Sequence, residues 1–163
     1  MRNIIERILI PVDFSRCSDR AVTYAVRLAA RLDASIELMH VVEDPILSGA
    51  WSPDIQVPSV LEMLETLSRE AEVKLAAMQT ATRAQGITTS SVVRPGRPSQ
   101  AIVEHAEAGR FDLIVMGTHG RTGLSHALLG SVAERVLRHA PCAVLTLKEQ
   151  RAEPRRATGT TAA

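Results

Sequence analysis

The stretch VMGTHGRTGLSHALLGSVAERV, residues 115–136, joins an apolar run to an amphipathic run through four glycines. Gly117, Gly120 and Gly123 fall within seven positions, and Gly130 follows seven residues later. Glycine has no Cβ atom and adopts positive φ readily, so it is typical of tight turns and of close approach to the main chain. The stretch therefore predicts a strand, a glycine-rich loop and a helix. The loop either makes a difficult turn or receives a ligand.

Strand and helix patterns alternate along the whole chain. Apolar and β-branched runs predict strands at 7–13, 35–42, 88–94, 111–118 and 143–148. Helical periodicity and stop signals predict helices after Ser15 or Ser18, from about residue 60 to Gly86, at 99–109 and at about 131–139. This alternation predicts an α/β fold with a parallel sheet and helices on both faces. Ligands of such sheets bind beyond the carboxyl ends of the strands.

Three further local patterns mark the connections. Ser59 and Ser131 each stand three residues before a glutamate, which is the capping-box spacing. Residues 43–57 contain two prolines and one glycine and predict a connecting loop. Arg97 lies in the predicted turn RPGRP, where it either reaches the ligand from a neighbouring loop or is solvated.

Composition excludes several classes of function. The 19 Lys and Arg nearly balance the 18 Asp and Glu, and only four aromatic residues occur, so nucleic-acid binding is disfavoured. No apolar stretch approaches the roughly 18 residues that span a bilayer, and the N-terminus lacks a signal-peptide core. The two cysteines have no metal-ligand spacing and indicate free thiols. We therefore expect a cytoplasmic protein with one domain, residues 1–148, and a disordered tail, residues 149–163.

The glycine loop matches neither common phosphate-binding motif. The chain contains no GK[ST] sequence, and the turn after the first strand has no glycine. The pattern Gly117-x2-Gly120-x9-Gly130-Ser131 nevertheless favours an anion site, because free N–H groups and the helix dipole attract negative charge at a helix start. Arg121 adds a countercharge. The alternative is that the glycines only turn the chain and Ser131 only caps the helix. The two roles are compatible.

The same glycine spacing, together with the opening ILIPVD and the closing SVAERVLRHAPCAVLTL, resembles the universal stress protein family, in its ATP-binding branch. The resemblance spans roughly residues 5–148. It implies a Rossmann-like five-stranded parallel sheet of order 3-2-1-4-5. It also implies ATP or ADP across the carboxyl ends of the first and fourth strands, and a homodimer formed through the last strand, Ala143 to Lys148.

The resemblance also implies which residues contact the nucleotide. Pro11 and Val12 match positions on the adenosine side of the family's site. Asp13 matches a carboxylate that contacts the ribose. Val41 matches a residue whose main chain contacts adenine. The phosphate loop is matched by Met116, Gly117, Thr118, His119, Gly120, Arg121, Gly130, Ser131 and Val132. For Asp13 the alternative role is a helix N-cap, and His119 is also interpreted as an exposed side chain.

We expect from these features a nucleotide-responsive regulatory protein of the stress response rather than an efficient enzyme. Asp13 is the only carboxylate in the matched loops, so Mg²⁺ or Mn²⁺ would be bridged by the phosphates and not held by a protein cluster. Two alternatives are a slow metal-dependent ATP hydrolase, and a module that binds cyclic AMP or docks on a protein partner.

Overall fold

The computed structural model describes residues 4–49, 57–118 and 129–148. In these residues one parallel sheet has the strand order β3-β2-β1-β4-β5. Its strands are β1 (Arg7–Pro11), β2 (Ser35–Glu43), β3 (Thr89–Gly96), β4 (Leu113–Gly117) and β5 (Ala143–Leu147). The helices are α1 (Arg16–Leu32), α2 (Pro45–Ser48), α3 (Val57–Arg83), α4 (Pro98–Ala108) and α5 (Ser131–His139). The α/β prediction and the strand order implied by the resemblance are both confirmed.

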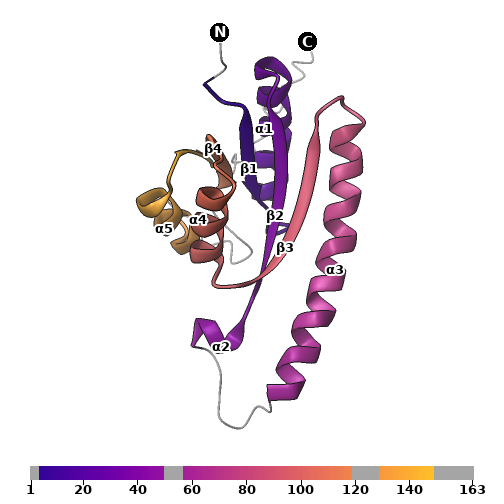
Figure 1. Ribbon diagram of the computed structural model, residues 1–163, viewed down its shortest axis with the longest axis vertical. Helices are drawn as coiled ribbons and strands as arrows, with labels where there is room; N and C mark the ends of the chain where they lie inside the picture. The colour runs from indigo at the N-terminus through magenta and orange to yellow at the C-terminus, as the bar shows by residue number, and fades with distance from the viewer. Residues whose placement is uncertain (1–3, 50–56, 119–128, 149–163) are drawn as a thin grey trace, which may run out of the picture.

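The alternation of side chains along β1 builds a core on each face of the sheet. Ile8 and Ile10 pack with α1 and with Leu75 of α3. Leu9 points the other way and packs with Ile102 of α4 and with α5. Figure 1 shows the result, with α3 on one side of the strands and α4 and α5 on the other. Helices on both faces leave the strand ends as the place where loops converge.

The starts of the two long helices follow different rules. The Ser15 hydroxyl accepts the Ser18 N–H at 3.3 Å and caps α1, as the sequence predicts. Helix α3 begins at Val57, so Ser59 already lies inside the helix and the predicted capping box there is wrong. Gly86, with φ of +82°, lies in the turn after α3 and confirms the predicted stop.

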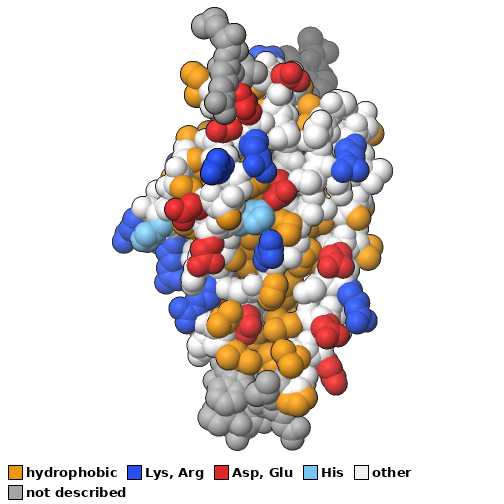
Figure 2. Space-filling model, viewed as in Figure 1, with side chains coloured by type: hydrophobic (Ala, Val, Ile, Leu, Met, Phe, Trp, Pro, Cys, Tyr) orange, Lys and Arg blue, Asp and Glu red, His pale blue; other side chains and the backbone are white. Residues whose placement is uncertain are grey.

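Part of the predicted loop at 43–57 forms the short helix α2. The Asp44 carboxylate accepts the N–H groups of Ile46 and Leu47, at 2.8 and 3.3 Å, which starts this helical turn. Both of these apolar side chains are exposed. Hydrophobic side chains gather in the same part of the molecule in Figure 2, below α4 and beside α3. Residues 50–56, with Trp51, lie outside the described residues.

Strand β3 extends two residues beyond the prediction of 88–94. Pro95 and Gly96 continue the parallel pairing with Val42 and Glu43 of β2. A proline fits here because β3 is the outer strand, where a missing N–H does not break a central ladder. Helix α4 then begins at Pro98, in the first-turn position that proline favours.

Two other expectations concern the C-terminal tail and membrane-spanning helices. The tail 149–163 lies outside them, so its predicted disorder stays a prediction. Within the described ranges, no helix has both the length and the apolar character needed to cross a bilayer.

Candidate functional site

A cavity of about 580 Å³ lies at the carboxyl ends of β1, β2 and β4. Its size falls in the range of small-molecule sites, about 300–1,000 Å³. All the predicted site residues that the structure describes line it: Pro11, Val12, Asp13, Val41, Met116, Gly117, Thr118, Gly130, Ser131 and Val132. His119, Gly120 and Arg121 lie outside the described residues. The fold thus brings four separate segments together, while their contact with a ligand stays a prediction.

Asp13 lies at the end of β1 on the wall of this cavity and is half-buried. Its carboxylate accepts the N–H of Ser15 at 3.0 Å. The N-cap of α1 is Ser15, so the N-cap alternative for Asp13 is wrong. The Asp13 carboxylate therefore stabilises the turn between β1 and α1, and it lies at the cavity wall.

Helix α5 begins at the opposite wall without a capping side chain. Its N-cap is Gly130, which has extended backbone and no side-chain cap bond. Ser131 is therefore the first helical residue, and Glu134 pairs with Arg138 at 2.8 Å instead of returning to the helix start. The predicted capping box at Ser131 is wrong. The first N–H groups of a helix have no partner within it, and here they lie at the cavity wall.

The two ends of the glycine loop are held together by main-chain bonds. The Gly130 N–H donates to the Thr118 carbonyl at 2.8 Å, and the Thr118 N–H donates to the Leu147 carbonyl at 2.9 Å. The end of β4, the start of α5 and the end of β5 are thereby fixed relative to one another. These bonds hold the main chain at both ends of the predicted phosphate loop, whose residues 119–128 lie outside the described part.

Gly117 has a packing reason to lack a side chain. A Cβ placed on it would lie 2.7 Å from the Cys17 Sγ and 3.2 Å from the Cys17 carbonyl carbon. Cys17 is buried, and its thiol donates to the Leu147 carbonyl at 3.3 Å. The first glycine of the loop therefore lets α1 approach β4 closely. Cys17 and Cys142 are both free thiols, as predicted.

Arg97 does not reach the cavity. Its Nε donates to the main-chain carbonyl of Leu47, and its side chain is exposed. The next residue in the chain, Pro98, lines the cavity, whereas Arg97 does not. The interpretation of Arg97 as a ligand contact is wrong, and its bond tethers α2 to the start of α4.

Sequence reasoning missed a wall of the cavity that α3 and α4 supply. Helix α3 contributes Leu67, Glu70, Ala71 and Lys74, and α4 contributes Pro98 and Ile102. In the sequence, the exposed residues of α3 that line the cavity cannot be distinguished from those of an ordinary solvent-facing helix surface. Only the rule that loops converge at the carboxyl ends of parallel strands could have directed attention to Pro98.

Phe14 and His40 were the other important omissions. His40 is buried, and its Nδ1 lies 2.6 Å from the Val12 carbonyl oxygen. The rings of Phe14 and His40 are 4.5 Å apart, and the Lys74 ammonium lies 5.2 Å from the centre of the Phe14 ring. Phe14, His40 and Lys74 all line the cavity.

The cavity offers no preformed metal centre in the described residues. Asp13, Glu43 and Glu70 lie on its walls. However, no three metal-ligating side chains come together anywhere in the ranges 4–49, 57–118 and 129–148. A divalent cation in the cavity would need most of its ligands from a bound molecule or from water.

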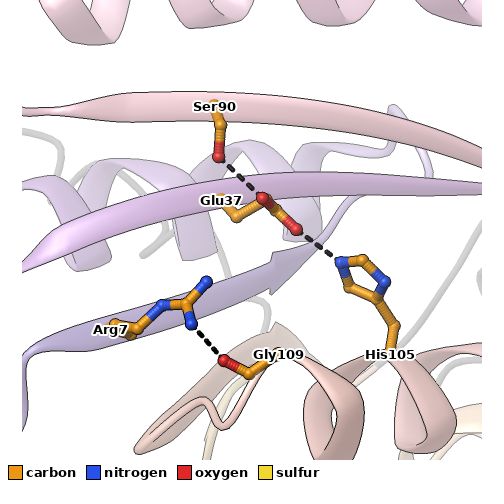
Figure 3. A network of polar contacts seen from close by, with 5 residues as sticks. All are labelled: Arg7, Glu37, Ser90, His105 and Gly109. Carbon is orange, nitrogen blue, oxygen red and sulfur yellow. Dashed lines mark hydrogen bonds and ion pairs between the residues drawn. The ribbon is translucent and has the colours of Figure 1, made fainter.

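A polar network lies elsewhere, around Glu37 on β2 (Figure 3). Its carboxylate accepts the Ser90 hydroxyl at 2.7 Å and contacts the His105 Nε2, while Arg7 donates to the Gly109 carbonyl. Glu37 stands between Ser90 and His105, so the histidine does not contact the serine and cannot activate it as a nucleophile. None of these residues lines the cavity. The network ties α4 to the sheet.

The pKa of Glu37 reflects competing effects. Burial alone would raise it, but the hydrogen bonds from His105 and Ser90, with the charges of His105 and Arg7, outweigh burial and leave the pKa below its usual value. Glu37 is therefore ionised in the folded protein over the whole neutral range.

Comparison with known proteins gives a consistent family assignment. The model of the universal stress protein family matches residues 5–148. A universal stress protein of Methanocaldococcus jannaschii is 36% identical and covers 93% of this chain and 86% of its own length. A universal stress protein A homologue of Coxiella burnetii is 32% identical, with 87% and 95% covered.

Solved structures agree with the sequence comparisons. The universal stress protein UspA from Lactobacillus plantarum is 28% identical, with a TM-score of 0.79 and with 88% of this chain and 97% of its own covered. A universal stress protein solved in complex with cAMP is 26% identical, with a TM-score of 0.59 and the same shares of the two chains covered. The second of these relatives thus binds an adenine nucleotide.

Proposed function

Since the chain belongs to the universal stress protein family, we propose that it binds an adenine nucleotide, ATP or ADP, in the cavity at the strand ends. The bound nucleotide makes the protein a regulatory element of the stress response. The proposal includes residues 1–148 as the nucleotide-binding domain, a homodimer, and a cytoplasmic location.

The observation that carries the proposal is the convergence of the predicted site residues. They were identified from a glycine spacing and a family resemblance, and those within the described ranges line one cavity of about 580 Å³. Residues from β1, β2, β4 and α5 converge there. The relative that binds cAMP supports an adenine nucleotide as the ligand class.

The two ends of the cavity suit the two ends of a nucleotide. The start of α5 presents Gly130 without a capping side chain, and free N–H groups together with the helix dipole favour phosphate oxygens there. Pro11, Val12 and Val41 offer apolar and main-chain surface for adenine. Asp13, between them, would accept hydrogen bonds from the ribose hydroxyls. This arrangement assigns a role to three of the four predicted segments, at residues 11–13, 41 and 130–132.

We propose binding rather than rapid hydrolysis. In-line attack on a phosphoryl group requires a positioned water and a metal ion. No three metal-ligating side chains come together in the described ranges, so Mg²⁺ or Mn²⁺ would enter with the phosphates. A phosphate-release assay with and without Mn²⁺ tests the alternative. Turnover faster than about one per minute, well below typical enzyme rates, would favour the hydrolase.

The direct test uses the purified protein. Denaturation followed by ion-exchange chromatography identifies any nucleotide carried through purification. Titration calorimetry with ATP, ADP, cAMP and GTP then ranks the ligands. We expect ATP or ADP to be released or to bind, and GTP to bind at least ten-fold more weakly. Absence of any bound adenine nucleotide, together with no heat on titration, would overturn the proposal. If the protein binds cAMP more tightly than ATP, cAMP takes the place of ATP as the proposed ligand.

A further inference from the structure

Phe14 adopts a backbone conformation that its side chain disfavours. Its φ is +63°, in the left-handed region, which bulky residues rarely occupy. The residue stands directly after Asp13, at the turn between β1 and α1. A strained residue beside a cavity persists only where its surroundings hold it, and such residues cluster at functional sites. The contacts of Phe14 therefore need an explanation.

The Phe14 ring is wedged between β2 and α3. On one side it lies 4.5 Å from the His40 ring, and His40 is itself bonded to the Val12 carbonyl. On the other side the Lys74 ammonium lies 5.2 Å from the ring centre, within cation–π range. The ring also packs against the buried cluster of Val42, Val60, Leu64 and Ala71. These contacts compensate for the unfavourable backbone.

The left-handed turn decides where the Asp13 carboxylate lies. After Asp13 the chain reverses at Phe14, which brings the Ser15 N–H to 3.0 Å from the Asp13 Oδ1. Both Asp13 and Phe14 line the cavity. If the turn relaxed to ordinary backbone angles, the Ser15 bond would break and the carboxylate would leave its position.

We propose that Phe14 is a positioning residue for ribose recognition, and that α3 takes part in it through Lys74 and the Phe14 ring. The ring locks the left-handed turn, and the turn holds the Asp13 carboxylate toward the hydroxyls of a bound nucleotide. This inference depends on the proposed function. A ring that only contacted the ligand would add affinity for every nucleotide. A ring that positions Asp13 adds affinity only for nucleotides that carry the hydroxyls.

The test compares the dissociation constants of ATP and 2′,3′-dideoxy-ATP by calorimetry. Hydrogen bonds to a charged group are stronger than those between neutral groups, so the wild type is expected to favour ATP about ten-fold or more. In Phe14→Gly, which accepts the turn but cannot hold it, this preference falls to about three-fold or less. Its affinity for dideoxy-ATP stays within about three-fold of the wild type. Phe14→Leu retains apolar packing without the ring and is expected to lie between the two.

Asp33→Gly is the matched control, since Asp33 also has positive φ, 53°, and does not line the cavity. Its preference for ATP should equal that of the wild type. The inference is overturned if Phe14→Gly, or Phe14→Leu should the glycine variant not fold, keeps the full preference. Equal loss of both affinities overturns it too. A wild type that binds neither nucleotide contradicts the proposed function instead, and one that binds both equally contradicts the ribose role of Asp13.

Discussion

Gly117 and Gly130 lack side chains for different reasons, although the sequence presents them as parts of one motif. Cys17 occupies the space beside Gly117, and a Cβ would meet its sulfur at 2.7 Å. Gly130 has φ −60° and ψ 147°, angles that any residue adopts, so its backbone does not require glycine. A substitution at Gly117 therefore tests packing, while one at Gly130 tests the ligand.

We expect Gly117→Ala to lower the free energy of unfolding by about 1–3 kcal/mol, the usual cost of overpacking. A double-mutant cycle of Gly117→Ala and Cys17→Ala, measured by urea unfolding, tests whether the Cys17 sulfur causes this loss of stability. The alanine at residue 117 should cost less in the Cys17→Ala background, because the sulfur is gone. An equal cost in both backgrounds would show that the sulfur is not the obstacle.

We expect Gly130→Ala to weaken ATP binding more than ten-fold, because a Cβ at the entrance of α5 keeps phosphate oxygens from the N–H groups. Stability should fall by no more than about 1 kcal/mol, the cost of alanine at an N-cap. Calorimetry and urea unfolding on the same sample separate the two effects. Wild-type affinity in this variant would remove the phosphate site from the start of α5.

At the scale of the element, the strands and helices were largely predictable, while the capping residues at two helix starts were not. Apolar runs predicted the strands, although β2 extends one residue and the outer strand β3 two residues beyond the predicted ends. The Ser-x-x-Glu pattern misled at Ser59 and Ser131, because a cap requires extended backbone at the serine itself. Val57 starts α3 before Ser59, and Gly130 takes the extended position before Ser131.

The Glu37 network makes a prediction about how α4 is held. Since the folded-state pKa of Glu37 lies below its usual value, its stabilising effect is present above the unfolded carboxyl pKa, about 4.3. The effect disappears as the pH falls through the folded value. Glu37→Gln should therefore lower the free energy of unfolding at pH 7 by about 1–3 kcal/mol, and the difference from wild type should shrink below about pH 4.

Urea unfolding at pH 7, 5 and 3.5 measures this dependence. Glu65→Gln is the control, because Glu65 forms an exposed ion pair with Arg69 on the surface of α3, and such pairs contribute little. A Glu37→Gln variant whose deficit is the same at pH 7 and pH 3.5 would contradict the ionic role of the network.

At the scale of the whole molecule, the sequence could predict that the site lies at the strand ends, because parallel topology brings those ends together. It could not predict the wall formed by α3. Glu70 and Lys74 lie on an exposed helix face, and nothing in their spacing distinguishes such a face from one turned wholly to solvent. Phe14 was equally hidden, since a backbone angle leaves no mark in a single sequence.

The outer position of β5 makes a prediction about assembly. In the described ranges β5 pairs with β4 alone and leaves one edge of the sheet open. Open edges pair readily with a second chain, and a two-fold arrangement closes on itself. Sedimentation velocity at micromolar concentration should therefore give a particle of twice the 17.7 kDa of one chain. A species of 17.7 kDa at that concentration would contradict the homodimer.

A crystal structure of the protein grown with excess ATP is the most direct test of the proposed nucleotide site. We expect adenine beside Pro11 and Val41, the ribose hydroxyls on Asp13, and phosphate oxygens within hydrogen-bond distance of the N–H groups of Ser131 and Val132. A cavity without nucleotide at saturating ATP, or a nucleotide bound elsewhere on the molecule, would contradict the proposed function and leave the fold and family assignment standing.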